Sequence, residues 1–351
     1  MIIIDGSHGE AGGQILRSAI ALSSLIRKPV KVINIRKKRN PPGLKYQHLH
    51  AIKLLEKITR AKTENVYVGS EDITFMPTGI YGGYYGENIG TAGSIPLLLQ
   101  AVALPALFAD DNIRLRIIGG TDVKNSPSMD YFTHIIGFYL NKFANISINI
   151  VRRGFYPKGG GEVLLEISPR FKVNEYKNFD EFLEDISKIG KINLYVEDIK
   201  KIEIYSVSSY ELKERNVAER MAEKAKELLE INGLPVKVRI DYAKTLSPGA
   251  VITLVAKTNT YVFGSDSIGE KGITAEKVAE NAVSKLLRVI KNRVSIDEHL
   301  ADNLIPYLML VGGYFSTYEL TGHLSTNIWV CKQFFNKEVK LNINKKVEIW
   351  I

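Results

Sequence analysis

The chain has 351 residues, 45% of them hydrophobic, so it can bury the core of one large domain and a smaller one. A formal net charge of +9 favours a polyanionic partner such as nucleic acid or nucleotide. No apolar run reaches the roughly 20 residues of a membrane span, and the single cysteine, Cys331, excludes intrachain disulfides and cysteine-based zinc sites. The opening MIIIDGSHGE lacks a basic leader, so we expect a cytoplasmic protein without membrane contact.

Residues 1–184 alternate short β-branched runs with apolar helical stretches. Strand-like MIII and VKVINI are followed by helix-like GGQILRSAIALSSLI and YQHLHAIKLLEKIT, and the alternation recurs in SIPLLLQAVALPALFA and IRLRIIGG. This pattern is typical of an α/β (α+β) domain in which helices cover a sheet. We expect residues 1–184 to form the first part of a large domain.

Near residue 185 the composition of the sequence changes, and highly charged segments begin. Strand-like KIEIYSVSS, helix-like NVAERMAEKAKELLEI, and the strands VKVRID and AVITLVAK follow one another. They predict a small inserted α/β domain over residues 185–277. Residues 278–351 begin with helical stretches of near-continuous apolar character, so the large domain is expected to resume there.

Glycine-bearing turns precede predicted helices in HGEAGGQILRS, NIGTAGSIPLLLQ and YELTGHLSTN, which suggests a repeated strand-turn-helix unit. In the first turn, glycines lead into a helix that carries Gln14 and Arg17 near its start. A helix N-terminus beside an arginine can bind an anion. A tight turn with a solvated arginine fits the same residues, and the Gly-Lys-Ser/Thr of a Walker A loop is absent.

A second basic segment, RKKRNPPGLKYQHL, begins at Arg36. Its cations leave a strand and meet two prolines, which stiffen the loop before a helix that bears Gln47. Charge runs are usually solvated, but a stiff basic loop suits phosphate recognition better than a mobile tail does.

The C-terminal region places two candidate groups near helix starts. In DEHLADNLIPYLML the leucines share one face, which leaves Asp302 free for ligand or histidine contacts. In YELTGHLSTN, His323 follows Gly322 where a helix begins. The helix dipole there disfavours imidazolium and favours a nearby anion, so a neutral, nucleophilic imidazole is plausible. A lone histidine is more often structural.

Taken together, the chain resembles the RNA 3'-terminal phosphate cyclases over nearly its whole length. The RGFYPKGGGEV segment looks like the family signature, and several motifs occur in the family's order. The matching segments are DGSHGEAGGQILRSA, RKKRNPPGLKYQHL, NIGTAGSIPLLLQ, IGGTDVKNSPS, RRGFYPKGGGEV, EHLADNLIPY and TGHLSTN.

This resemblance implies a fold and a reaction. The large domain would contain three repeated β-α-β-α-β-β units, each with two helices over a four-stranded sheet, as in enolpyruvyl transferases, and a smaller inserted domain. The expected partners are ATP and RNA with a 3'-phosphate end, with a divalent metal, Mg or Mn. A histidine takes AMP from ATP and passes it to the RNA phosphate. The neighbouring 2'-hydroxyl then closes a 2',3'-cyclic phosphate and releases AMP.

The resemblance also assigns roles to residues. His323 corresponds to the nucleophile and Glu10 to the acid near the metal. One departure is His299, where a relative has tyrosine, which affects the expected stacking on the base. The expected adenylate contacts are Gln100, His299, Leu300, Ala301, Asp302 and Asn303, and the expected contacts to triphosphate or the RNA end are Gln14, Arg17, Arg36, Arg39 and Gln47.

Two rival functions remain open from the sequence. A non-catalytic ribosome-assembly relative of the same fold would bind RNA or protein without forming an adenylate, but such relatives lack the histidine that is present here as His323. An enolpyruvyl transferase would share only the fold and would have no need of His323.

Overall fold

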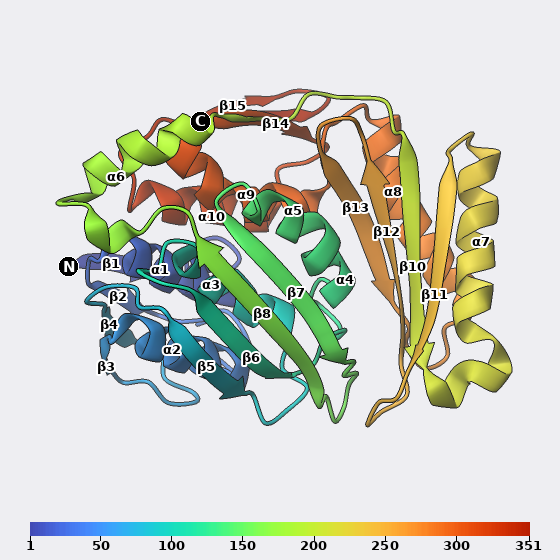
Figure 1. Ribbon diagram of the computed structural model, residues 1–351, viewed down its shortest axis with the longest axis horizontal. Coiled ribbons are helices and arrows are strands. Elements are labelled where there is room, and N and C mark those ends of the chain that lie inside the picture. The colour runs from blue at the N-terminus through green and yellow to red at the C-terminus, as the bar shows by residue number, and fades with distance from the viewer.

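A computed structural model describes all residues, 1–351, as a mixed α/β protein, which confirms the expected fold class. Four sheets of four strands each are covered by helices, and one sheet with its helices stands to one side of the other three (Figure 1). No helix combines the length and the apolar character needed to cross a membrane.

Three units of the chain repeat one order of elements. The first unit comprises β1 (Ile2–Asp5), α1 (Gly13–Ile26), β2 (Val30–Ile33), α2 (Tyr46–Thr59), β3 (Lys62–Glu64) and β4 (Ile73–Met76). The second comprises β5 (Gly83–Asn88), α3 (Ile95–Ala106), β6 (Ile113–Gly119), a segmented helix (α4 Met129–Tyr131, η1 Phe132–Ile136, α5 Gly137–Leu140), β7 (Ala144–Arg152) and β8 (Gly161–Pro169). The third comprises β9 (Ile192–Asn193), α9 (Glu298–Val311), β14 (Gly313–Thr317), α10 (Gly322–Lys332), β15 (Lys340–Ile343) and β16 (Val347–Trp350).

The three units also share one strand topology. In each, the first strand runs parallel to the second, the second is antiparallel to the fourth, and the fourth is antiparallel to the third. The sheet orders are β1-β2-β4-β3, β5-β6-β8-β7 and β9-β14-β16-β15. The expected β-α-β-α-β-β repeat is therefore confirmed.

Alternating side chains explain why each sheet carries helices on one face. Along β6, Ile113, Leu115 and Ile117 are buried, whereas Arg114 and Arg116 between them are exposed. Successive strand residues point to opposite faces, so the apolar set packs under helices and the arginines face solvent.

The insert interrupts the third unit between β9 and α9. Its sheet has the order β11-β10-β12-β13, with β10 parallel to β11 and antiparallel to β12. Outside the insert, the short helix α6 (Phe179–Ile186) precedes β9 in the chain. The elements of the insert are β10 (Lys201–Ser209), η4 (Tyr210–Arg215), α7 (Val217–Ile231), β11 (Val236–Ala243), β12 (Ala250–Lys257), β13 (Val262–Ile268) and α8 (Ala275–Lys291).

The packing divides the chain differently from the predicted boundaries at residues 185 and 277. Strand β9 pairs with β14 of the third unit, and α8 packs on β12, β13 and α7. The apolar face of α8 predicts a return to the large domain, but an apolar face does not specify which sheet it will cover. We propose that the inserted unit runs from β10 through α8.

Asp297 joins the insert to the third unit. Its Oδ1 accepts hydrogen bonds from the Tyr131 hydroxyl at 2.6 Å and from the backbone N–H of Leu300 at 3.0 Å, which caps α9. Its Oδ2 accepts from the N–H of Gly264 in β13 at 3.1 Å. The start of α9 is thereby fixed to two other parts of the fold.

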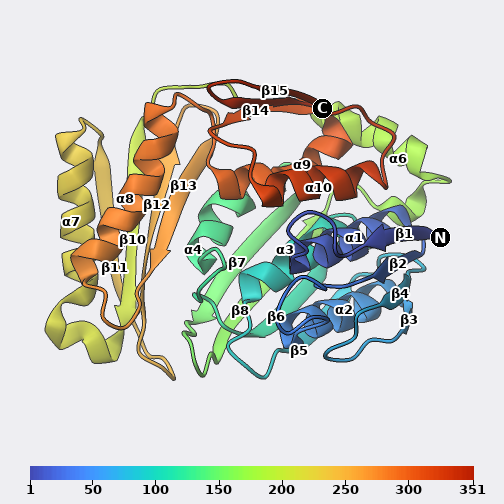
Figure 2. The ribbon, with the colours of Figure 1, turned by 180° about the vertical axis from the view of Figure 1, so that it is seen from behind.

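Helices from distant parts of the sequence meet near the centre of the molecule. Helix α10 packs on both α1 and α9, and α1 packs on α3 (Figure 2). One apolar core continues from these helices into the insert, where it includes Ile204 and Leu254. The N-terminal turns of α1 and α10 are brought together by this packing.

Candidate active site

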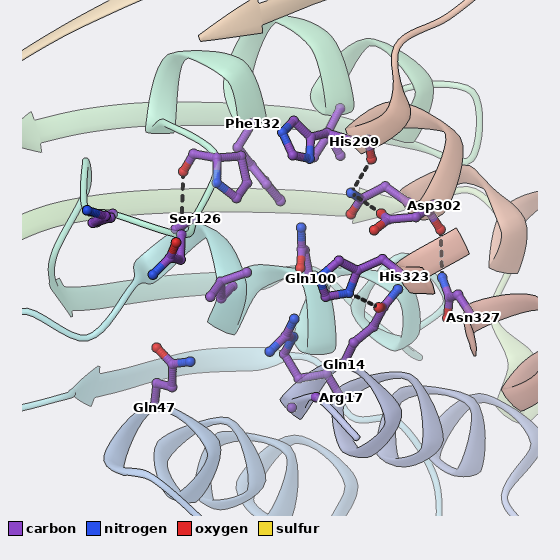
Figure 3. A pocket seen from close by; sticks show the side chains of 18 of the residues that line it. Gln14, Arg17, Gln47, Gln100, Ser126, Phe132, His299, Asp302, His323 and Asn327 are labelled. Carbon is purple, nitrogen blue, oxygen red and sulfur yellow. Dashed lines mark hydrogen bonds between the residues drawn. The ribbon is translucent and has the colours of Figure 1, made fainter. Parts of the chain in front are cut away.

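A cleft of about 880 Å³ opens between the repeated units and the insert. Helices α1, α2, α3, α9 and α10 contribute to its walls (Figure 3). Strand β13 and helix α8 of the insert also contribute residues. Most of the predicted site residues line it, namely Gln14, Arg17, Arg36, Arg39, Gln47, Gln100, His299, Asp302, Asn303 and His323. Glu10 lies in an adjoining hollow of about 440 Å³, which His299, Asp302 and His323 also line.

His323 is held from both sides of its ring. It occupies the first turn of α10, whose N-cap Thr321 accepts a hydrogen bond from the Leu324 N–H at 3.0 Å. Its Nδ1 lies 2.6 Å from Gln14 Oε1, and its Nε2 lies 3.3 Å from Glu10 Oε2. Figure 3 shows Gln14 and His323 pointing toward each other across the cleft floor.

These contacts favour one protonation state of His323. An amide oxygen can only accept, so the Gln14 contact favours a proton on Nδ1, whereas the Glu10 carboxylate favours a proton on Nε2 and must turn away to leave the Nε2 lone pair free. Partial burial lowers the pKa of His323 below its usual value, with a further lowering from Arg17, whereas Glu10 acts in the opposite direction. The ring can therefore present an unprotonated Nε2 near neutral pH.

The loop that carries Glu10 is packed directly against the start of α10. A Cβ at Gly322 would lie 2.6 Å from Glu10 Cδ, so any larger residue there would displace this carboxylate from its present position. Arg39 approaches the same loop, with Nε donating to the Glu10 carbonyl at 3.2 Å and Nη2 lying 3.8 Å from Glu10 Oε2. Glu10 is thus placed beside His323 by steric fit and by charge.

Asp302 and Arg17 form a second charged pair of groups in the cleft. Burial raises the pKa of Asp302 to about 7, although His299 and Arg17 oppose this shift. Burial lowers the pKa of Arg17 to about 10, so the guanidinium stays protonated at neutral pH. A half-buried arginine cation that lines the cleft is suited to an anionic ligand.

The basic loop divides its arginines between two roles. Arg36 is 6% exposed, and its Nη1 donates to the carbonyls of Pro41 at 2.9 Å and Gly43 at 2.8 Å. Its main contacts therefore stabilise the loop itself. Arg39 is half-exposed and Gln47 lines the cleft, so these two remain available to a ligand.

Two predicted contacts do not reach the cleft. Leu300 and Ala301 are fully buried and line neither hollow. The N–H of Leu300 is already donated to Asp297. The inward face of α9 carries both side chains into the core, and their role as adenylate contacts stays a prediction.

Other cleft residues were not singled out from the sequence. Asn327 donates through Nδ2 to the Asp302 carbonyl at 2.6 Å and accepts through Oδ1 from the Ser18 hydroxyl at 2.7 Å, so it ties α10 to α9 and α1. Its spacing of four residues from His323 places both on one helical face, which was a usable signal. Lys285 and Asp266 reach the cleft from the insert, and no local motif marked them.

Comparisons with known proteins identify the family of the chain. A family model described as RNA 3'-terminal phosphate cyclase matches residues 8–341. Proteins named RNA 3'-terminal phosphate cyclase from Pyrococcus furiosus and Pyrococcus abyssi are 42% and 41% identical to the chain, over 99% and 97% of its length and 98% and 95% of theirs. One from Methanosarcina acetivorans is 40% identical over 99% of the chain and 98% of its own length. The chain therefore belongs to the RNA 3'-terminal phosphate cyclase family.

Proposed function

We propose that this enzyme uses ATP to convert an RNA 3'-terminal phosphate into a 2',3'-cyclic phosphate through a covalent adenylate on His323. The observation that carries the proposal is the 2.6 Å contact between His323 Nδ1 and Gln14 Oε1, which leaves Nε2, on the side of Glu10, as the nitrogen that can attack.

In the first step, the Nε2 lone pair attacks the α-phosphorus of ATP. An N–P bond forms, the bond from the α-phosphorus to the bridging oxygen breaks, and pyrophosphate leaves. The Nδ1 proton stays on the hydrogen bond to Gln14, so the ring in the adduct is cationic and remains a good leaving group. The N-terminal turns of α1 and α10 and the guanidinium of Arg17 favour the negative charge that builds up nearby.

In the next two steps, AMP is transferred from His323 to the RNA 3'-phosphate and is then released. An oxygen of the 3'-phosphate attacks the adenylate phosphorus, the N–P bond breaks, and neutral His323 is restored. The 2'-hydroxyl then attacks the 3'-phosphorus, loses its proton, and displaces AMP. Arg39 and Gln47 lie on the cleft wall where they can hold the terminal phosphate in line.

The adenosine part of ATP has its own candidate contacts. His299, Asp302 and Asn303 at the start of α9 face the cleft together with Gln100 of α3. An ionised Asp302 can accept hydrogen bonds from a sugar hydroxyl. The ring of His299 lies edge-on to Tyr131, with centroids 6.3 Å apart, which limits its tilt.

Glu10 fits a divalent metal only in part. No group of three or more His, Cys, Asp or Glu side chains gathers in a metal-binding arrangement. Mg²⁺ is commonly held by one or two carboxylates plus substrate phosphates, so one carboxylate beside the triphosphate suffices. When bound, the ion would neutralise phosphate charge, and Glu10 would turn from His323 Nε2 to hold it.

The proposal is tested by incubating the protein with ATP and measuring its intact mass. We expect one added AMP, which peptide mapping places on His323 and which acid removes. His323→Ala should take up no AMP, whereas His50→Ala, at the contact of α2 with Glu87 of β5 and outside the cleft lining, should be labelled normally.

A second experiment tests whether AMP transfer to the RNA end precedes ring closure. With an RNA whose terminal 2'-hydroxyl is replaced by hydrogen, the adenylylated 3' end should accumulate because ring closure lacks its nucleophile. AMP labelling of His323→Ala, or the absence of an adenylylated end when the protein itself is labelled, would contradict the mechanism.

A further inference from the structure

An exposed strip of basic and aromatic residues adjoins the cleft at the start of α2. We call it the rim; it consists of Lys37, Lys38, Lys45, Tyr46 and Tyr67. Tyr46 is 54% exposed and Tyr67 is 60% exposed, although large aromatic side chains are normally covered. Lys45 also lines the cleft, so the rim continues directly from the proposed phosphate site.

Backbone contacts hold the two tyrosines on either side of one junction. The Leu44 N–H donates to the Ser70 carbonyl, and the Gly69 N–H donates to the Leu44 carbonyl, each at 2.9 Å. Gly43 permits this approach, since it has a φ of 74° and a Cβ there would overlap the Gly69 carbonyl. The rim is therefore built by two segments that are fixed to each other.

The rim carries unneutralised positive charge. Among the cations of residues 36–45, only Arg39 lies within 4.0 Å of a carboxylate, that of Glu10. The opposite end of the cleft differs, because Asp266 and Glu270 of the insert lie among its lysines and Glu270 pairs with Lys124 at 2.8 Å. The unpaired positive charge therefore favours a path along the rim for a polyanion that extends out of the phosphate site.

We propose that the rim binds the single-stranded RNA that precedes the 3'-phosphate, with Tyr46 and Tyr67 as stacking platforms for bases and the lysines along the backbone. Exposed aromatics interleaved with cations are the arrangement by which proteins bind single strands without reading sequence. The proposal rests on the proposed function for the position of the RNA end.

The test compares binding of 3'-phosphorylated RNAs of two and eight nucleotides by fluorescence anisotropy, without ATP. The parent should bind the longer RNA more tightly. The double variant Tyr46→Ala/Tyr67→Ala should lose most of this gain, which corresponds to roughly 5- to 150-fold for each stacked base. Its affinity for the dinucleotide and its AMP labelling should stay unchanged.

Tyr210→Ala is the matched control, since this tyrosine of the insert is 55% exposed and lies outside the rim. It should keep the gain with length. The rim proposal would be overturned if the double variant kept the higher affinity for the longer RNA. It would also be overturned if Tyr210→Ala lost this difference in affinity to the same extent, even with normal AMP labelling. RNA binding is measured without ATP, so it does not depend on AMP transfer. If the parent protein takes up no AMP, the proposed function is refuted, but the binding measurements still test whether the rim binds RNA.

Discussion

Substitutions of Gln14 separate the two ways in which this residue can act on His323. Gln14→Leu keeps the approximate volume but removes the acceptor for the Nδ1 proton. The loss of one such hydrogen bond corresponds to about 0.5–1.5 kcal/mol, or roughly 2- to 13-fold in rate, and any tilt of the ring adds to it. The labelling rate should therefore fall at every pH without a shift of the profile.

Gln14→Glu instead places a carboxylate where an amide oxygen lies 2.6 Å from Nδ1. An opposite charge this close typically raises the pKa of an imidazolium by about 1–3 units. In the parent the pKa of His323 is lowered, so the neutral ring should be lost only in acid. In the variant the rise of labelling with pH should move upward, with slow labelling near pH 7 and recovery in alkali.

The assay is single-turnover transfer of labelled AMP to the protein at saturating ATP, between pH 5.5 and 9. The surface variant Gln333→Leu on the far end of α10 serves as the control. An unchanged rate in Gln14→Leu together with an unchanged profile in Gln14→Glu would show that Gln14 does not set the protonation state of His323.

Three further predictions concern the charged groups of the site. Since the pKa of Asp302, about 7, lies above its usual 3.8, stability should fall by up to about 4 kcal/mol as pH rises from about 4 to 7, and denaturant titrations of Asp302→Asn should lack this decline. Gly322→Ala must displace Glu10, so labelling should drop about 100-fold with little change in Tm. Chelation should stop labelling in the parent, and Glu10→Gln should need at least about tenfold more Mn²⁺ to restore half the rate.

The sequence was sufficient for the repeated fold and for most of the cleft. Period-two and helical patterns identify elements such as β6 and α9, and the repeat that the strand pairings confirm was implied by the family resemblance. The glycine-bearing turns do not mark it, because they precede the first helix in two units but the second helix, α10, in the third. Motif order then brought together residues that are far apart in the chain, such as Gln14 and His323. Which residues meet across 309 positions could not be derived from local periodicity alone.

Features that depend on tertiary packing escaped prediction. The buried face of α8 fits equally well against any apolar sheet, so periodicity alone does not specify that α8 packs on β12 and β13. Arg36 belongs to a charged run, yet its guanidinium is enclosed by its own loop because positive φ at Arg36 and Gly43 folds the chain back on itself. Leu300 and Ala301 lie within a matching motif, but the helical phase turns them into the core.

Asp297 has a consequence for motion. A rotation of the insert wide enough to open the cleft would draw the Gly264 N–H away and leave a buried carboxylate short of one donor, at a cost of about 1–3 kcal/mol. Wide-open molecules would then be a minor population, of the order of 1–15% at that cost. Because the same carboxylate caps α9, the helix that carries Asp302 would be disturbed in each such opening. The width of the entrance and the geometry of the nucleotide contacts are therefore mechanically linked.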